Sequence, residues 1–137
     1  MDLVNNLAQA IAKFEGYFNP ENTLAKRNNN PGNLRSWGSY PVSEGYAKFP
    51  DAETGWAALR RQVQLNINRG LNLYEFFAGK GGVYAGYAPS ADSNNPTHYA
   101  RTVAGWVGID PTVKLASYQG TGEGGTSPPL GSASGEC

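Results

Sequence analysis

The sequence predicts a mostly α-helical α+β domain with one small β-hairpin. Three observations support this prediction. Apolar residues recur at helical spacing in several stretches, one short region alternates apolar and polar residues, and Asn, Asp and Gly stand where helices should begin and end. The 137 residues are enough for one hydrophobic core. We expect a folded domain over residues 1–118 and a flexible Gly/Ser/Pro-rich tail or linker over residues 119–137.

The first expected helix covers residues 2–15 and breaks at Gly16. Its apolar face is formed by Val4, Leu7 and Ile11. Glu15 continues that face at the next helical position. A carboxyl group half-buried among apolar side chains has a raised pKa, which is the property that a general acid needs near neutral pH. By spacing alone, a solvated surface residue at a helix end is the more common alternative.

Two short stretches after the first helix have the alternation of β-strands. Residues 33–37 and 46–49 alternate apolar and polar side chains, and the connection between them contains Gly, Ser and Pro. We expect these two stretches to pair as a hairpin.

The second and third helices are marked by their caps. The second should begin after Pro50 with Asp51 as its N-cap and end at Gly70. Its expected buried face comprises Ala52, Trp56, Leu59, Val63 and Ile67. The third is short, and Asn72 with Glu75 three residues later forms the pattern of a capping box.

The fourth helix should begin at Pro96, with Asn95 as its N-cap, and end at Gly108. Its expected inward-facing residues are Tyr99, Val103 and Trp106. Residues 110–115 are expected to form one last short helical turn. Residues 79–82, Gly-Lys-Gly-Gly, lack the spacing of a phosphate-binding loop and should form a glycine-rich connection.

Composition and charge exclude several classes of function. Eleven basic and eleven acidic residues cancel, so no net field draws the chain to nucleic acid. No apolar run is long enough to span a membrane, and the N-terminal stretch lacks the pattern of a signal peptide. We therefore expect a monomer that is made in the cytoplasm. Cys137 has no cysteine partner, and His98 has no partners at metal-ligand spacing, so we expect no disulfide, metal or cofactor.

Four short motifs follow one another along residues 11–110. Residues 14–17 read Phe-Glu-Gly-Tyr, and residues 28–35 read Asn-Asn-Asn-Pro-Gly-Asn-Leu-Arg. Residues 46–59 contain Tyr-Ala-Lys-Phe and Gly-Trp-Ala-Ala-Leu, and residues 87–99 contain Tyr-Ala-Pro, two Asn and a Tyr. In this order they resemble the peptidoglycan-cleaving domains of the lysozyme-like superfamily, which include phage endolysins and lytic transglycosylases.

The resemblance implies a lysozyme-like fold of two lobes, with the hairpin beside a cleft and Glu15 at its floor. It implies cleavage of the β-1,4 bond between N-acetylmuramic acid and N-acetylglucosamine in bacterial peptidoglycan, with Glu15 as general acid and base. The enzyme would then act on the cell wall after phage release, from a virion or after export. A glycosidase of the same fold that acts on chitin, or a non-catalytic glycan-binding or structural module, remains an alternative.

The number of catalytic carboxylates depends on which relative the chain follows. The Thr-Ile-Gly-Tyr-Gly-His hairpin and the Asp-Thr pair of many phage lysozymes are absent from this sequence. The resemblance to lytic transglycosylases implies that Glu15 alone protonates the glycosidic oxygen and then acts as base while the 6-hydroxyl closes a 1,6-anhydro ring. Inverting hydrolysis needs a second carboxylate roughly 6.5–9.5 Å away. Glu44 is the first candidate for it and Glu21 the second, whereas Asp92 is expected in a turn.

The candidate substrate-binding residues are Asn33, Trp37, Tyr46, Tyr87 and Asn94. Trp37 and Tyr46 flank the expected hairpin, where a flat ring could stack on a sugar, although short strands also use aromatic residues for packing. Tyr87 could instead be a core aromatic residue. Residues 29–33 could form a tight turn and nothing more, in which Pro31 fixes φ and Gly32 supplies a positive φ. Alternatively, Asn33 in addition contacts sugar hydroxyl or N-acetyl groups.

Overall fold

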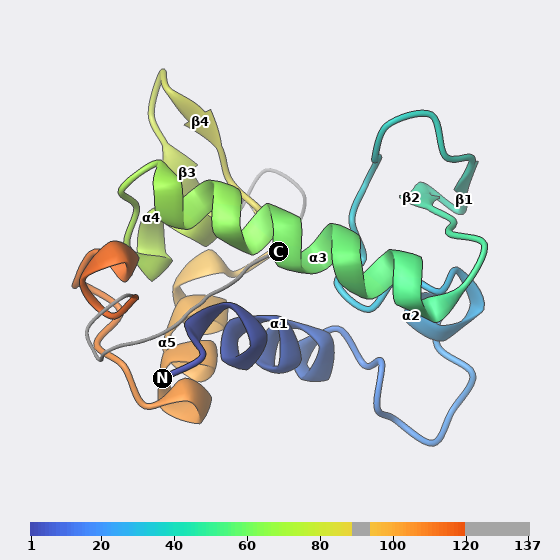
Figure 1. Cartoon of the computed structure of the whole chain (residues 1–137), viewed down its shortest axis with the longest axis horizontal. Helices are drawn as coiled ribbons and strands as arrows, with labels where there is room; N and C mark the ends of the chain where they lie inside the picture. The colour runs from blue at the N-terminus through green and yellow to red at the C-terminus, as the bar shows by residue number, and fades with distance from the viewer. Residues whose placement is uncertain (89–93, 120–137) are drawn as a thin grey trace. The chain divides into compact units, whose positions relative to one another are not determined.

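The computed structural model describes residues 1–88 and 94–119 (Figure 1). Within these residues helices predominate, and the strands form two short antiparallel hairpins, which confirms the mostly α-helical α+β class. In chain order the elements are α1 (Leu3–Phe14), α2 (Leu24–Arg27), β1 (Val42–Ser43), β2 (Tyr46–Ala47), α3 (Ala52–Asn68), α4 (Leu73–Ala78), β3 (Gly79–Lys80), β4 (Tyr84–Ala85), α5 (Pro96–Val107) and the 3-10 helix η2 (Leu115–Ser117).

The chain divides into two compact units. Val4–Val63 forms one, called here the N-terminal unit, and Met1–Leu3 with Gln64–Cys137 forms the other, the C-terminal unit. The expected tail from Gly120 onward and residues 89–93, with Asp92, lie outside the described residues. None of the helices found in the described residues is long and apolar enough to cross a membrane.

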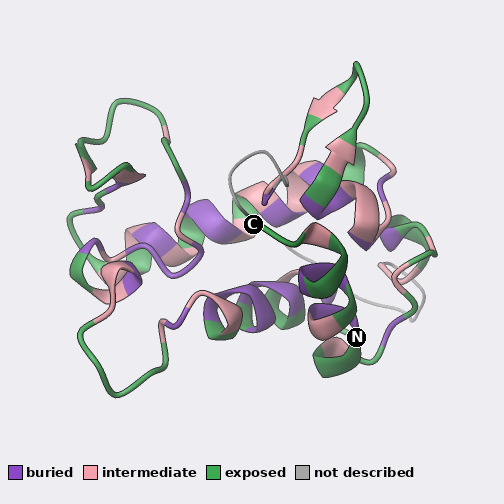
Figure 2. Cartoon of the chain, turned by 180° about the vertical axis from the view of Figure 1, so that it is seen from behind, coloured by how far each residue is buried: buried purple, intermediate pink, exposed green. Residues whose placement is uncertain are grey.

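The end of α1 is determined by Gly16. This residue has φ +85°, a left-handed conformation that glycine adopts readily and that stops a helix. The Gly16 N–H donates to the Lys13 carbonyl at 3.2 Å, and the Tyr17 N–H donates to the Ala12 carbonyl at 3.0 Å. These two bonds are a Schellman motif, and they place Glu15 at the C-cap. Leu7 and the other apolar residues of the helix interior are buried (Figure 2).

The second strand of the first hairpin lies within the expected residues 46–49, but its first strand lies later in the chain than the sequence predicts. β1 pairs with β2, and the turn residues Glu44 and Gly45 both have positive φ, +57° and +87°, as two-residue hairpin turns require. The expected strand over residues 33–37 is wrong, because Asn33 at its start has φ +49° and turns the chain away from an extended path. One ladder-like bond remains there, from the Ala47 N–H to the Leu34 carbonyl at 2.9 Å.

Helix α2 and the part of α3 up to Val63 complete the N-terminal unit. α2 has four residues, too few for a periodic signal in the sequence, and it buries Ala25. The expected cap of α3 is confirmed, since the Thr54 N–H donates to Asp51 Oδ1 at 2.8 Å. Gly55, inside α3, touches the preceding loop so closely that a Cβ atom there would lie 1.8 Å from the Asn29 carbonyl oxygen.

The caps predicted for the C-terminal unit are also confirmed. Asn72 and Glu75 form the capping box of α4, and Asn95 caps α5, which ends at Gly108 in the left-handed conformation. The unit has an aromatic core whose stacked pair, Phe77 and Tyr99, has ring centroids 4.1 Å apart. Its other rings are Phe76 and Tyr87.

Three expectations for the C-terminal unit are wrong. Trp106 is 45% exposed and is therefore not a core residue, although it lies on the expected helical face. Residues 79–85 form the β3–β4 hairpin, not an irregular connection. The last helical turn begins at Leu115 and not at Asp110, because the Asp110 side chain accepts the Thr112 N–H at 2.9 Å and closes a separate turn.

Candidate functional site

Glu15 lies half-buried at the C-cap of α1. Its own N–H donates to the Ile11 carbonyl at 2.9 Å, so the backbone that carries the carboxylate is still held by the last turn of the helix. The Asn33 side chain reaches it from the following loop, and Asn33 Nδ2 donates to Glu15 Oε1 at 3.0 Å. The structure thus brings together two residues that the sequence nominated separately.

The loop that carries Asn33 is held by asparagine side chains. Asn28 Nδ2 donates to the Ser43 carbonyl of β1 at 3.0 Å, and Asn29 Nδ2 donates to the Phe49 carbonyl at 3.1 Å. Asn30 is fully buried, and its Nδ2 donates to the carbonyl oxygens of Leu34 and Ala47, both at 2.9 Å. Its Oδ1 accepts the Leu34 N–H at 2.9 Å. These bonds tie the loop to the hairpin and to the start of α3.

Asn33 differs from these three asparagines. Its φ of +49° is left-handed, as is that of Asn29, but its Oδ1 is buried without a hydrogen-bond partner among the described residues. A buried carbonyl oxygen with no donor destabilises a fold by about 1–3 kcal/mol. The Nδ2 group of the Asn33 amide therefore has a hydrogen-bond partner in Glu15, whereas its Oδ1 has none among the described residues.

The two candidates for a second carboxylate, Glu44 and Glu21, are exposed, whereas Glu15 is half-buried. Glu44 lies in the turn of the first hairpin, 58% exposed, and forms an ion pair with Arg27 at 3.2 Å. Glu21 is exposed in the loop before α2, where its backbone carbonyl accepts a hydrogen bond from Lys26 Nζ at 2.8 Å. The ion-pair partner of the Glu44 carboxylate is therefore Arg27. Within the described part of the chain, no group of three His, Cys, Asp or Glu residues could hold a metal ion.

The two aromatic candidates near the first hairpin are half-buried. The Arg35 guanidinium lies over one face of the Tyr46 ring, with Cζ 4.9 Å from the centroid, so that face is covered by a cation–π contact. Trp37 lies in the loop before Tyr40, whose N–H donates to the Trp37 carbonyl at 3.1 Å.

The other two substrate-binding candidates belong to the C-terminal unit. The Tyr87 ring lies 5.6 Å from Phe76 and 5.9 Å from Phe77, centroid to centroid, which supports the alternative that Tyr87 is a core aromatic residue. Asn94 is exposed just before the Asn95 cap.

An aromatic cluster that the sequence analysis does not predict begins two residues after Glu15 and includes one residue of α3. It consists of Tyr17, Phe18 and Trp56. The Tyr17 ring lies 5.4 Å from each of the other two rings in edge-to-face contact, and Phe18 lies 6.1 Å from Trp56. Phe18 is 53% exposed, and Trp56, expected in the core, is only half-buried. The sequence feature that could have indicated this cluster is the pair Tyr17 and Phe18, immediately after Glu15 and Gly16.

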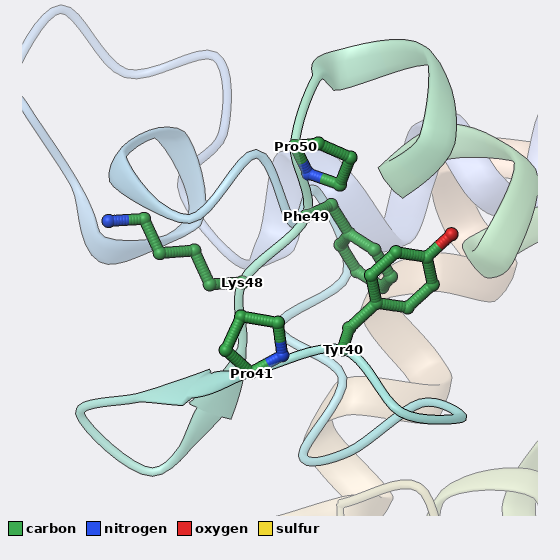
Figure 3. A pocket seen from close by; sticks show the side chains of 5 residues that line it. All are labelled: Tyr40, Pro41, Lys48, Phe49 and Pro50. Carbon is green, nitrogen blue, oxygen red and sulfur yellow. The ribbon is translucent and has the colours of Figure 1, made fainter.

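A separate pocket of about 330 Å³ lies beside the first hairpin (Figure 3). The Tyr40 and Phe49 rings meet there with centroids 5.1 Å apart, and the Lys48 ammonium group points away from them. The residues that line the pocket are Tyr40, Pro41, Lys48, Phe49 and Pro50. Its walls are therefore mainly apolar, and Glu15 and Asn33 are not among the lining residues.

Comparisons with protein-family models, with curated proteins and with solved structures found no match for this chain.

Proposed function

We propose that this chain is a peptidoglycan glycosidase that cleaves the β-1,4 bond between N-acetylmuramic acid and N-acetylglucosamine, with Glu15 as the general acid and base. The observation that carries the proposal is the 3.0 Å hydrogen bond from Asn33 to Glu15, which spans 18 residues of sequence. It joins the Phe-Glu-Gly and Asn-Pro-Gly-Asn motifs, the two segments whose resemblance to lysozyme-like enzymes is most direct. A chance similarity of two short motifs would give no reason for their polar side chains to meet.

The chemistry requires the Glu15 carboxyl group to change its protonation state twice. In its acid form it donates a proton to the glycosidic oxygen while the bond from that oxygen to the anomeric carbon breaks. In an inverting hydrolase a second carboxylate takes a proton from the attacking water, whereas in a lytic transglycosylase the Glu15 carboxylate takes the proton of the 6-hydroxyl of the muramic acid residue, whose oxygen bonds to the anomeric carbon and closes the anhydro ring.

The pairing of Glu44 favours the second of these routes. An inverting hydrolase needs another carboxylate free to activate water, but the Glu44 carboxylate is engaged by Arg27 in the hairpin turn. We therefore propose a lytic transglycosylase that works with Glu15 as its one catalytic carboxylate. The exposed Phe18 ring, with the half-buried Tyr17 and Trp56 beside it, supports a saccharide substrate, because a flat ring can cover the apolar face of a sugar.

The test is mass spectrometry of purified peptidoglycan after digestion with the wild type, Glu15→Gln and Glu44→Gln. We expect fragments with anhydro-muramic ends from the wild type and Glu44→Gln, and none from Glu15→Gln. Glu44→Gln is the matched control, because it changes a carboxylate of the same unit that lies outside the proposed reaction. Reducing muramic ends would replace the transglycosylase with a hydrolase. Undigested wall in every sample, with glycan still bound, would favour a binding module.

A further inference from the structure

We infer that Asn33 is the positioning residue of Glu15, and that its amide gives the two carboxyl oxygens different tasks. Asn33 Nδ2 donates to Oε1, and we assign to Oε2 the proton that is transferred. This inference rests on the proposed acid and base role of Glu15.

The assignment of the oxygens follows from donor and acceptor chemistry. The Nδ2 group of an amide only donates, so Oε1 at 3.0 Å must accept. A proton on Oε1 in that direction would face the N–H group, and the acid form therefore carries its proton on Oε2. During cleavage that proton passes from Oε2 to the glycosidic oxygen as the bond to the anomeric carbon breaks. Oε2 then takes the proton of the attacking hydroxyl group, while both Nδ2 protons stay on nitrogen.

The second argument is that Asn33 lowers the stability of the fold. Asn33 shares its left-handed backbone with Asn29, but its buried Oδ1 lacks a partner within the described residues. Strain and unsatisfied polar groups of this kind concentrate at functional sites, where geometry matters more than stability.

Asn29 provides a matched comparison in the same loop. Its φ is +51°, nearly that of Asn33, but its Nδ2 donates to the Phe49 carbonyl and not to Glu15. The two asparagines thus share a backbone conformation and differ in the acceptor of their side-chain hydrogen bond, which is a backbone carbonyl for Asn29 and a carboxylate for Asn33.

The first experiment compares Asn33→Gly with Asn29→Gly, using cleavage kinetics and thermal unfolding of the full chain. For Asn33→Gly we expect kcat to fall by about 10- to 100-fold, with KM changed less than about threefold and Tm no lower than the wild type. For Asn29→Gly we expect a lower Tm, because a structural hydrogen bond is lost, and kcat within about twofold of the wild type. Wild-type kcat in Asn33→Gly, or a fall in its Tm that matches its loss of activity, would overturn the inference.

The second experiment reads the carboxyl group directly and needs no activity. The Glu15 carboxyl carbon is followed by NMR during a pH titration of the wild type, Asn33→Gly and Asn33→Asp. Loss of a hydrogen bond to the ionised form should raise the pKa of Glu15, and a second carboxyl group at position 33 should raise it further. Identical titration curves in all three proteins would overturn the inference. If no protein cleaves peptidoglycan but the curves shift as expected, the proposed function fails while Asn33 still positions Glu15.

Discussion

Within one stretch of six residues, asparagine side chains perform two kinds of task. Asn28, Asn29 and Asn30 donate to backbone carbonyl oxygens and fix the loop, whereas Asn33 donates to a carboxylate. An amide suits both tasks because it presents a donor and an acceptor on one short planar group. The partner and not the burial separates the roles, since Asn28 and Asn30 are almost completely inaccessible but Asn29 is half-buried, as Asn33 is.

The position of Glu15 predicts how activity depends on pH. Glu15 is half-buried at the end of an apolar helical face, and it must begin the reaction in its acid form. We expect cleavage to decline on the alkaline side with an apparent pKa above about 5. Initial rates measured between pH 4 and pH 9 check this, and a rate that stays constant to pH 9 would contradict it.

Phe18 offers a test of the aromatic cluster. We expect Phe18→Ala to raise KM for glycan strands by about 2- to 10-fold while kcat stays within about twofold, because a stacking ring contributes about 0.5–1.5 kcal/mol to binding. Kinetics on soluble glycan fragments measure both constants. Tyr40→Ala is the control, since Tyr40 is another exposed aromatic residue of the same unit, packed on Phe49. An equal increase in KM for both variants would remove the special role of the cluster.

Among the helices, α3 depends on two residues at its start. Asp51 accepts hydrogen bonds from the backbone and the side chain of Thr54, and Gly55 allows the Asn29 carbonyl to approach the helix. The same turn of α3 therefore caps the helix and supports the loop that carries Asn33.

Gly55→Ala should destabilise the protein, although alanine favours helices by about 1 kcal/mol. The added Cβ would overlap the Asn29 carbonyl oxygen, and relieving such overpacking costs about 1–3 kcal/mol. The loop would shift, so activity should fall as well. Gly105→Ala in α5 is the control, because a Cβ there meets nothing within 4 Å, and this change should raise the free energy of unfolding. Denaturant unfolding gives the free energy of unfolding of both variants. A Gly55→Ala variant more stable than the wild type would contradict the prediction and show that the loop can move away from the added Cβ without cost.

The cap of α3 also predicts a dependence of stability on pH. The hydrogen bonds from the Thr54 side chain and backbone hold the pKa of Asp51 below its usual 3.8. Because the pKa is lower in the folded state, the stabilisation is complete above the unfolded value and is lost as the pH falls through the folded value. Asp51→Asn keeps a capping side chain that does not titrate. We therefore expect Asp51→Asn to lose less stability than the wild type between pH 6 and pH 2.5, measured by thermal unfolding. An equal loss in both proteins would contradict this expectation.

At the scale of the whole molecule, the residues of the proposed site and the stacked aromatic core lie in different units. Glu15, Asn33 and the aromatic cluster all belong to the N-terminal unit. The stacked aromatic core of Phe76, Phe77, Tyr87 and Tyr99 belongs to the C-terminal unit, and so does the buried Leu115 near the end of the described chain.

Two truncations test where the folded part of the chain ends. We expect a chain that stops at residue 119 to unfold at the wild-type temperature and to retain its activity, because the remaining residues have almost nothing to bury. A chain that stops at residue 114 loses Leu115, which is fully buried and whose N–H donates to the Leu71 carbonyl at 2.9 Å. Loss of such a side chain costs about 2–5 kcal/mol. Thermal unfolding measures the stability of both truncated chains. A marked loss of stability in the chain that stops at residue 119 would contradict the expectation that the residues after it form a flexible tail.

The amino-acid sequence by itself determined the features that act over a few residues. The caps at Asp51, Asn72 and Asn95 and the helix ends at Gly16 and Gly108 were predicted and confirmed, because a cap depends on one side chain and its nearest backbone groups. Glu15 could be nominated for the same reason, as the residue that continues an apolar face up to a glycine.

Only the tertiary structure decided what those residues meet. The residues that alternate after Asn33 do not form a strand, because the left-handed turn at Asn33 and the bonds of Asn30 direct the loop elsewhere. Trp106 is exposed and Glu44 pairs with Arg27, and neither fact is encoded in local periodicity. Helical and strand patterns specify which face is apolar, whereas hydrogen bonds and packing between residues far apart in sequence specify the partner. The contact between Asn33 and Glu15 is of this second kind.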